Sequence, residues 1–253
     1  MGKYCERIFH ALILQKDLNM RCVVINGTEQ RGCTYNLKEI FLDELKPEHL
    51  TEFYFPKDAP GYCAGCKLCF VQSETSCPHY KKVNPIWQAM LEADLIVFAY
   101  PVYVLRAPGH IKSFLDHLGV HWSVHRPDPR MFNKTAVIIT QSIGSPNGVA
   151  QKDVKTSLNW LGVPKVKRIG FGMMDDVFWE NISKTRKQGF ERKMRAFARK
   201  FHTVEPANRS LKTRFIFQIC KMLQTYIVKK TPEDEALSVD AQYWIDQGWI
   251  TRK

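Results

Sequence analysis

The strongest constraint on the fold is an alternation of short apolar runs with stretches of helical periodicity. The apolar runs, rich in Val, Ile and aromatic residues, lie at residues 22–26, 50–55, 95–100, 135–140 and 166–173. Apolar residues recur at helical spacing in the segments 34–45, 85–92, 108–118, 149–161 and 182–203. Strands that are apolar along their whole length are typical of parallel sheets covered on both faces. The pattern therefore predicts an α/β fold of the flavodoxin type, with a doubly wound, five-stranded parallel sheet.

The 253 residues are enough for one sizeable domain with an appendage. We expect an N-terminal extension at 1–20, the α/β domain at 21–203, and a basic, aromatic, helical C-terminal extension at 204–253. A loop at 56–82 interrupts the α/β pattern, and a loop of that length usually has a function.

The net charge of +12 is confined to one part of the chain. Residues 181–230 contain 14 Lys/Arg and two acids, which accounts for the whole excess. A basic protein is a candidate for nucleic-acid binding, but the main body of this chain is neutral, so we expect no nucleic-acid partner. The basic segment is interpreted as a solvated helix face, with docking to an anionic surface or partner as the alternative. The sequence shows no signal peptide and no apolar stretch of membrane-spanning length, which favours a cytoplasmic protein.

A sheet of this type binds its ligand beyond the carboxyl ends of its strands, where the strand order reverses. We therefore expect three loops to form the site, at residues 27–34, 101–107 and 141–148. The first has two glycines, two threonines and an arginine before a helix, a composition that suits a phosphate, although Glu29 would repel one unless it points away. A turn in which Gly and Thr serve only geometry and capping is the alternative.

The other two loops offer different chemistry. Tyr103 can pack against a planar ring, with a partly buried tyrosine as the alternative. The loop after the fourth strand presents amides and hydroxyls that suit the polar edge of such a ring. Together the three loops favour a phosphorylated planar cofactor.

These loops belong to a longer pattern. Its parts are the opening Gly27-Thr28, the run Cys63-Ala64-Gly65-Cys66-Lys67-Leu68-Cys69, the strand Ala93–Phe98 leading into Pro101-Val102-Tyr103, and His110–Asp116. In this order they resemble the NAD(P)H-dependent FMN reductase family of flavodoxin-like proteins, over about residues 22–174. Within that family the pattern is most similar to the iron–sulfur flavoproteins, which carry a compact four-cysteine motif in the same loop.

The resemblance implies FMN in the crevice and NAD(P)H as the electron donor. The phosphate would be held by Thr28, Arg31, Cys33 and Thr34. The isoalloxazine ring would be flanked by Pro101, Val102, Tyr103 and Val104, with Arg106 nearby, and its polar edge bound by Thr140, Gln141, Ser142 and Gly144. The sequence departs from the family at Glu29, where proline is common, at Cys33, where a small polar residue is common, and at 81–84, where several relatives have an acidic pair. Because the flavin carries the redox chemistry, no catalytic acid–base pair is expected.

Four cysteines lie within fifteen residues of the loop at 56–82: Cys63, Cys66, Cys69 and Cys77. Their C-x2-C-x2-C-x7-C spacing can ligate a [4Fe–4S] cluster, which is our preferred interpretation. The alternatives are zinc, whose four-thiolate sites are usually built from two separate C-x2-C pairs, and free thiols without metal.

The sequence thus predicts an FMN-dependent NAD(P)H oxidoreductase that passes electrons, through a cluster if one is bound, to a quinone, a flavin or a protein. The alternative is an electron carrier or redox sensor without turnover of its own. Flavodoxin-type carriers are usually shorter and acidic, so length and charge count against that alternative.

The C-terminal extension contains an apolar stripe at helical spacing, formed by Leu211, Phe215, Ile219, Met222, Leu223 and Tyr226. We expect this stripe to pack on a second copy of the chain, giving a homodimer. Capping of the protein's own sheet and adsorption to a membrane surface are the alternatives.

Overall fold

A five-stranded parallel sheet forms the centre of the molecule. The computed structural model describes residues 20–174, 178–203, 206–207 and 210–252, so the expected N-terminal extension lies outside the described residues except for Met20. The strands are β1 (Arg21–Asn26), β2 (His49–Tyr54), β3 (Leu95–Pro101), β4 (Thr135–Ser142) and β5 (Lys165–Gly172). They are hydrogen-bonded in the order β2-β1-β3-β4-β5, every pair parallel. This is the flavodoxin-like order, so the predicted fold class is confirmed.

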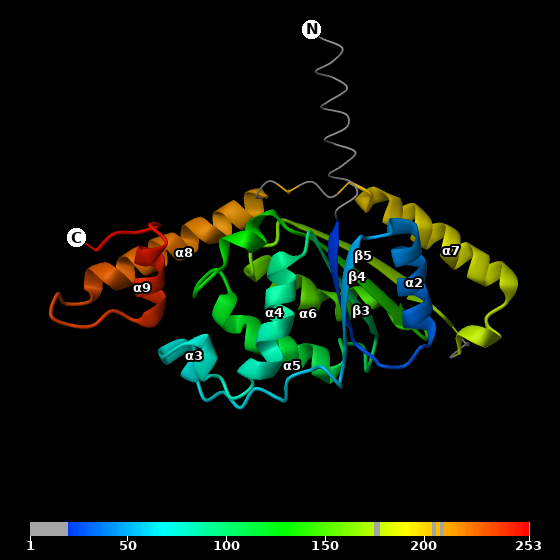
Figure 1. Cartoon of the computed structure of the whole chain (residues 1–253), viewed down its shortest axis with the longest axis horizontal. Coiled ribbons are helices and arrows are strands. Elements are labelled where there is room, and N and C mark those ends of the chain that lie inside the picture. The colour runs from blue at the N-terminus through cyan, green and yellow to red at the C-terminus, as the bar shows by residue number, and fades with distance from the viewer. Residues whose placement is uncertain (1–19, 175–177, 204–205, 208–209, 253) are drawn as a thin grey trace, which may run out of the picture.

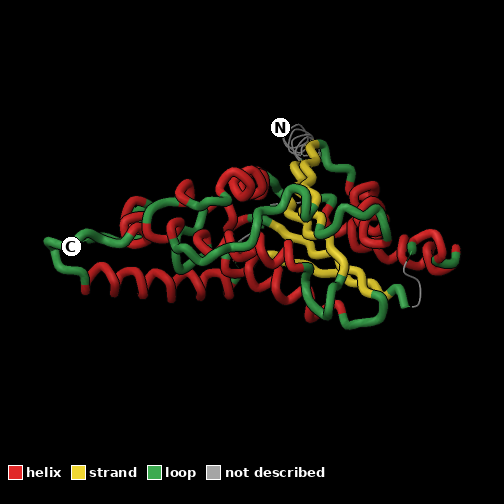
Figure 2. Tube along the Cα trace, turned by 90° about the horizontal axis from the view of Figure 1, so that it is seen from below, coloured by secondary structure: helices red, strands yellow, loops and turns green. Residues whose placement is uncertain are grey.

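Helices cover both faces of the sheet (Figures 1 and 2). One face packs against α2 (Cys33–Leu45) and α7 (Lys184–Ala198), and the other against α4 (Tyr80–Glu92), α5 (Gly109–His117) and α6 (Asn147–Trp160). Alternate residues of one strand enter opposite cores: Ile96 and Phe98 join the α4–α6 side, and Leu95 and Val97 the α2–α7 side. Because both faces are buried at the centre of the sheet, β1, β3 and β4 have no polar face, whereas the edge strands β2 and β5 carry exposed polar residues.

The strand order fixes the position of the crevice. β1 and β3 are neighbours, but the chain turns towards one face after β1 and the other face after β3, so the loops that follow them diverge. The gap between diverging loops at the carboxyl ends of the strands is where ligands bind in such sheets.

The loop at 56–82 is more structured than its sequence indicated. It contains a short helix α3 (Leu68–Val71), a 3₁₀ turn (Glu74–Ser76) and the start of α4. We expected this helix at 85–92, and the predicted start was wrong: α4 begins at Tyr80 with Pro85 inside it. The apolar face of α4 already starts at buried Val83, and its burial offsets the hydrogen bond that proline cannot donate.

Part of the basic segment has a structural role in α7. Arg195 pairs with Asp43 and Glu44 of α2 at 2.8 and 3.1 Å, and Arg199 Nε lies 2.8 Å from Glu44 Oε1. The side chains of Arg195 and Arg199 remain partly exposed, so these contacts position α7 on α2 more than they stabilise the fold.

The C-terminal extension consists of α8 (Leu211–Lys230) and α9 (Val239–Asp246), at the opposite end of the molecule from α7 (Figure 1). Its buried residues form a separate small core together with Phe132 of the α/β domain: Phe217, Cys220, Val228, Ala241, Trp244 and Ile250. Trp244 is fully buried and stacks on Phe217 with ring centroids 5.1 Å apart. Among the described helices, none is long and apolar enough to cross a membrane.

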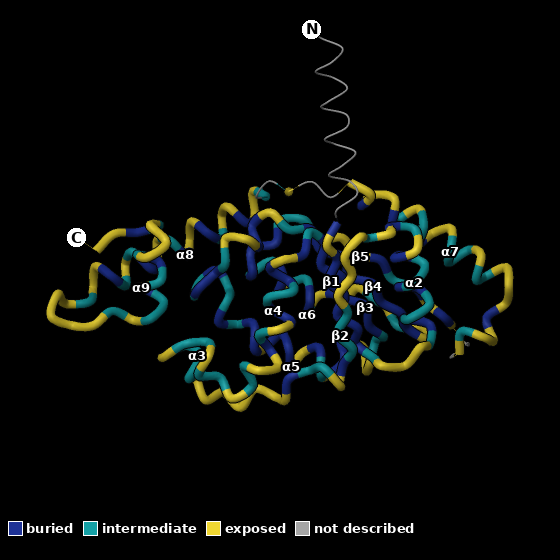
Figure 3. Tube along the Cα trace, in the orientation of Figure 1, coloured by how far each residue is buried: buried dark blue, intermediate teal, exposed yellow. Residues whose placement is uncertain are grey.

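The predicted apolar stripe of α8 faces outward. Phe215 is 66% exposed and Met222 72%, while the opposite side of the helix, with Phe217, Cys220 and Val228, is buried (Figure 3). The stripe therefore does not cap the protein's own sheet. Exposed apolar patches of this extent usually mark interaction surfaces.

Two phenylalanines two positions apart on α8 test this orientation. We expect Phe217→Ala to lower the free energy of unfolding by about 3–5 kcal/mol, because it opens a cavity beneath Trp244 and Trp249. Phe215→Ala should change it by less than about 0.5 kcal/mol, because the ring is already in solvent. Urea denaturation at low protein concentration measures both values, and equal losses would contradict the described orientation of α8.

Candidate functional site

The three loops predicted to form the site meet at the carboxyl edge of the sheet, and Gln141 connects them. The Val102 N–H donates to the Gln141 carbonyl at 2.7 Å. Thr34, in the first turn of α2, donates its hydroxyl to Gln141 Oε1 at 3.3 Å, a contact that is buried. One residue near the carboxyl end of β4 thus fixes the loop after β3 and the helix after β1.

The first loop is shaped by a close approach at Gly27. A Cβ on Gly27 would lie 2.4 Å from the Cβ of Tyr100, so no other residue fits without a shift of backbone. The Gly27 N–H donates to the Ala99 carbonyl at 2.8 Å, and His110 Nε2 donates to the Gly27 carbonyl at 2.9 Å. These contacts hold the turn between β1 and α2 on top of β3.

The N-terminus of α2 points its backbone amides into this loop. The first bond of the helix runs from the Asn36 N–H to the Gly32 carbonyl at 3.1 Å, and Gly32 at the N-cap has no side chain that could cap the first turn. The amides of an uncapped first turn carry partial positive charge and bind anions.

Glu29 points away from this helix terminus. Its Oε1 accepts a hydrogen bond from the Lys57 N–H at 2.7 Å. Arg31 lies on the same loop with its guanidinium 5.4 Å from the centre of the Tyr35 ring. The Glu29 carboxylate, which counted against phosphate binding, is therefore hydrogen-bonded to Lys57 instead. The Arg31 guanidinium remains beside α2.

The second loop contains a strained turn. Tyr103 and Arg106 exchange two backbone hydrogen bonds, of 3.0 and 2.9 Å, around Val104 and Leu105, both of which have positive φ (48° and 64°). A β-branched residue in that region is an outlier. The turn leaves Val104 95% exposed and Leu105 57% exposed. Strain of this kind persists at functional sites, and here it holds two apolar side chains and the half-exposed Tyr103 at the crevice.

Arg106 is directed away from the three loops. Its guanidinium lies 3.7 Å from Asp153 of α6, beside a groove between α5 and α6. The resemblance implied a position near the isoalloxazine ring for Arg106, whereas the structure places its side chain against α6.

The third loop supports the crevice mainly from below. Thr140 is fully buried, and its hydroxyl accepts a hydrogen bond from Gln151 Nε2 at 2.8 Å. Ser142 donates to the Ser145 carbonyl at 2.6 Å, which closes the turn. Gly144 is exposed at its tip. Thr140 and Ser142 thus shape the loop, and Gly144 is its exposed tip.

The start of the cysteine loop is fixed on α5. The Gly61 carbonyl accepts hydrogen bonds from Ser113 Oγ at 2.9 Å and from His117 Nε2 at 2.8 Å. Burial lowers the pKa of His117 below its ordinary value, so the imidazole is neutral near pH 7. Its Nδ1 then accepts the weak hydrogen bond of the Cys77 thiol, whose Sγ lies 3.8 Å away.

The four predicted metal ligands differ in exposure. Cys63 and Cys66 are exposed, and Cys69 and Cys77 are half-buried. Burial raises the pKa of the Cys69 thiol, and nearby charges on Cys77, Cys63 and Cys66 raise it further. Within the described part of the chain, no three His, Cys, Asp or Glu side chains are arranged to hold a metal ion. A cavity of about 210 Å³ lies behind Cys69 and Cys77, with Trp87 and the stacked His121 in its wall.

Sequence reasoning missed several residues that shape the site. It assigned no role to His110 or His117, whereas His110 holds the first loop and His117 the cysteine loop. Their spacing of seven residues on one helix face, next to the Pro-x-Tyr turn, is the signal that could have found them.

The strand order and the three-loop crevice define a flavodoxin-like α/β protein with a ligand site at its carboxyl edge. Residues 20–175 match the family model of the NADPH-dependent FMN reductases, which is more than half of the chain. The chain therefore belongs to the NADPH-dependent FMN reductase family, and is an NAD(P)H-dependent oxidoreductase.

Individual relatives agree with this assignment. An iron–sulfur flavoprotein of Archaeoglobus fulgidus is 24% identical over 91% of this chain and all of its own length. An FMN-dependent NADH:quinone oxidoreductase of Clostridium perfringens is 23% identical over 70% of this chain and 84% of its own.

Solved structures show the same fold. The NAD(P)H:quinone oxidoreductase of Methanothermobacter marburgensis has a TM-score of 0.58 at 15% identity, over 74% of this chain and 99% of that one. An FMN-dependent NADH-azoreductase of Bacillus anthracis, in complex with FMN, has a TM-score of 0.56 at 14% identity, over 72% of this chain and 99% of that one.

The strained turn gives a test of the site. Asn and Gly favour positive φ, so Val104→Asn combined with Leu105→Gly should raise the free energy of unfolding by about 1–2 kcal/mol. The same change removes apolar surface from the crevice, and we expect it to weaken FMN binding about tenfold, or 1.4 kcal/mol. Denaturation and fluorescence titration with FMN measure the two effects.

Lys46, the C-cap of α2, is the matched control because its φ is also positive (49°) and it lies at the other end of α2 from the crevice. Lys46→Gly should stabilise the fold and leave FMN affinity unchanged. Unchanged FMN affinity in the Val104/Leu105 variant would remove that turn from the binding site.

Proposed function

We propose that the crevice binds FMN and that the protein uses it to oxidise NAD(P)H. The observation that carries this proposal is the connection of Thr34, Gln141 and Val102, which joins a helix N-terminus, a ring-flanking turn and an amide-bearing loop into one site. The helix N-terminus suits a phosphate, the turn suits the face of a planar ring, and the amide-bearing loop suits the polar edge of that ring. A phosphorylated planar group therefore matches the site. When bound, FMN supplies hydride acceptance from the nicotinamide and release of electrons to an acceptor.

In this proposal the residues of the crevice bind FMN and orient it. The amides of the first turn of α2, with Thr28, Arg31 and Thr34, hold the phosphate, and Cys33 contributes its backbone there. Pro101 to Val104 flank the ring, and the exposed apolar tip of the turn excludes water from one side of it. Gln141 and Gly144 meet the polar edge, while Thr140 and Ser142 support them from beneath.

For the acceptor, we infer a quinone. Relatives named FMN-dependent NADH:quinone oxidoreductases support this class. A flavin or a protein acceptor, and a carrier or sensor without turnover, are the outcomes that the experiment below separates from it.

We also propose that the four cysteines ligate an iron–sulfur cluster. Four thiols within one loop have the chemistry of such a ligand set, and a relative covering 91% of the chain is named an iron–sulfur flavoprotein. As placed, however, the thiols do not form a metal-binding group. Ligation would require the exposed stretch around Cys63 and Cys66 to fold over Cys69 and Cys77, and the proposed flavin function does not depend on it.

One set of measurements on anaerobically purified protein tests these proposals. We expect one FMN per chain, NADPH or NADH oxidation that depends on an added water-soluble quinone, and iron with sulfide in the same material. Gly27→Ala should abolish FMN binding because its Cβ collides with Tyr100, whereas Gly32→Ala, with open space around it, should retain it.

Each part of that result can fail separately. Protein that takes up no FMN contradicts the proposed function, and FMN binding without turnover with any acceptor leaves the carrier. Absence of iron and sulfide overturns only the cluster.

We further propose that α8 pairs with a second copy of the chain. The apolar stripe is outward, Lys212 and Arg214 lie at the start of α8, and the acidic turn Glu233-Asp234-Glu235 follows its end. Antiparallel pairing about a two-fold axis brings the acidic turn of one copy to the basic end of the other. In this pairing the apolar stripes cover each other, and the acidic turn of each copy lies near basic residues of both copies, since Lys229 and Lys230 precede it in the last turn of α8.

Sedimentation velocity tests this assembly. The wild-type chain should sediment as a dimer, and Phe215→Glu as a monomer, because a charge would be buried in the interface. Gln188→Glu, exposed on α7 at the other end of the molecule, is the control and should remain dimeric. A monomeric wild-type protein contradicts the proposal, and its co-sedimentation with anionic vesicles would assign the stripe to a lipid surface.

A further inference from the structure

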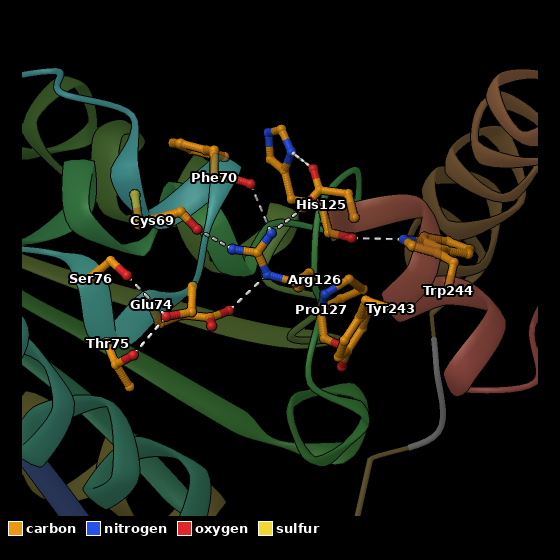
Figure 4. Close-up of polar contacts among 12 residues, drawn as sticks. Cys69, Phe70, Glu74, Thr75, Ser76, His125, Arg126, Pro127, Tyr243 and Trp244 are labelled. Atoms are coloured by element: carbon orange, nitrogen blue, oxygen red, sulfur yellow. Dashed lines mark hydrogen bonds and ion pairs between the residues drawn. The ribbon is translucent and has the colours of Figure 1, made fainter. Parts of the chain in front are cut away.

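A buried arginine joins the cysteine loop to the C-terminal helix. Arg126 lies between α5 and β4, and its side chain is 4% exposed. Its Nε donates to Glu74 Oε1 at 2.8 Å, and the two terminal nitrogens donate to the Cys69 carbonyl, the Phe70 carbonyl and Asp240 Oδ1 (Figure 4). Three of these four acceptors belong to the cysteine loop, and the fourth to α9.

The contacts of α9 are centred on the same place. Asp240 also accepts from His125 Nδ1 at 2.7 Å, and Trp244 Nε1 donates to the His125 carbonyl at 2.7 Å. The Tyr243 hydroxyl donates to the Pro127 carbonyl at 2.7 Å. Residues on each side of Arg126 are therefore tied to α9, as Figure 4 shows.

The chemistry of this cluster requires an arginine. A buried cation is unfavourable unless it is paired and hydrogen-bonded, and here two carboxylates neutralise it. Burial raises the pKa of Glu74, but the hydrogen bond and charge of the Arg126 guanidinium lower it. The pKa of Glu74 is lowered overall, so its carboxylate stays ionised. The planar fork of arginine reaches several acceptors at once, which the single ammonium of lysine cannot do.

The two ends of the cysteine loop are thus held differently. Its start is fixed at Gly61 by Ser113 and His117 of α5. The part with Cys69 and Cys77 is held by Arg126, and the Cys77 N–H donates to the carbonyl of the clamped Glu74 at 3.1 Å. The exposed Cys63 and Cys66 lie between the two attachments.

We propose that Arg126, held in place by Asp240 of α9, is the positioning residue of the cysteine site, so that the C-terminal extension is a working part of that site. Arg126 fixes Cys69 and Cys77 against the body of the protein, while Cys63 and Cys66 stay free to move towards them. This assignment goes beyond the proposed oxidoreductase function and depends neither on FMN nor on a bound cluster.

Site-resolved alkylation of the thiols tests the proposal. Reduced, chelator-treated full-length protein is treated with iodoacetamide, and mass spectrometry gives a rate constant for each cysteine. In Asp240→Asn, Arg126 loses a carboxylate, and we expect Cys69 and Cys77 to react about tenfold faster through local opening of the loop. Cys63 and Cys66, already exposed, should change by less than about twofold. Asp240→Glu, which keeps the carboxylate, should restore slow alkylation.

Asp246→Asn is the matched control. Asp246 is exposed on the same helix and accepts only from Gln242 at 2.7 Å among the contacts described, so its loss should leave all four rates unchanged. Arg126→Lys, which keeps the charge but not the fork, should reproduce the selective increase, and it serves as the test if Asp240→Asn does not fold.

The pattern of rates decides the outcome. Unchanged rates at Cys69 and Cys77 in both variants overturn the proposal. An equal acceleration of all four thiols and of buried Cys220 overturns it as well, because that pattern indicates general unfolding.

Discussion

Burial of both faces of the parallel sheet is the constraint on which the rest of the structure depends. Strands without a polar face must be covered by helices on two sides, and right-handed connections to those helices force the chain to change direction between β1 and β3. The diverging loops leave a crevice at the carboxyl edge. The position of the site is therefore a consequence of how apolar surface is removed from water.

Within that crevice, strain and packing are arranged for a ligand. Gly27 lets the first loop lie on β3, and the turn at Val104 and Leu105 keeps two apolar residues in an unfavourable conformation. The remainder of the functional surface is added from outside the sheet. The cysteine loop is attached to α5 at one end and, through Arg126, to the C-terminal extension at the other. Electron-transfer chemistry proposed for the crevice and thiol chemistry proposed for the loop are thus supported by separate parts of one chain.

The strands and the position of the site could be predicted from the sequence, because they depend on the local apolar pattern and on the strand order. All five strands were placed within about two residues, and the loop positions followed from the strand order. The reach of Glu29 to Lys57 could not be predicted, because it depends on a contact 28 residues away, and Arg126 and Asp240 are separated by 114 residues. The left-handed backbone of Val104 runs against the preference of a β-branched residue, so propensity pointed the wrong way. The helix α4 begins five residues before the predicted segment 85–92, and its additional turn buries Val83. In α8 the apolar stripe was found, but only the structure shows that Phe217 and Val228, outside the stripe, form the buried side.

The most direct test of the central claim is a crystal structure of the protein grown with FMN. The account predicts the phosphate against the first turn of α2, the ring beside Tyr103 and Val104, and its polar edge at Gln141 and Gly144. Density for the flavin at any other surface of the protein, or an unaltered crevice at saturating FMN, would contradict it.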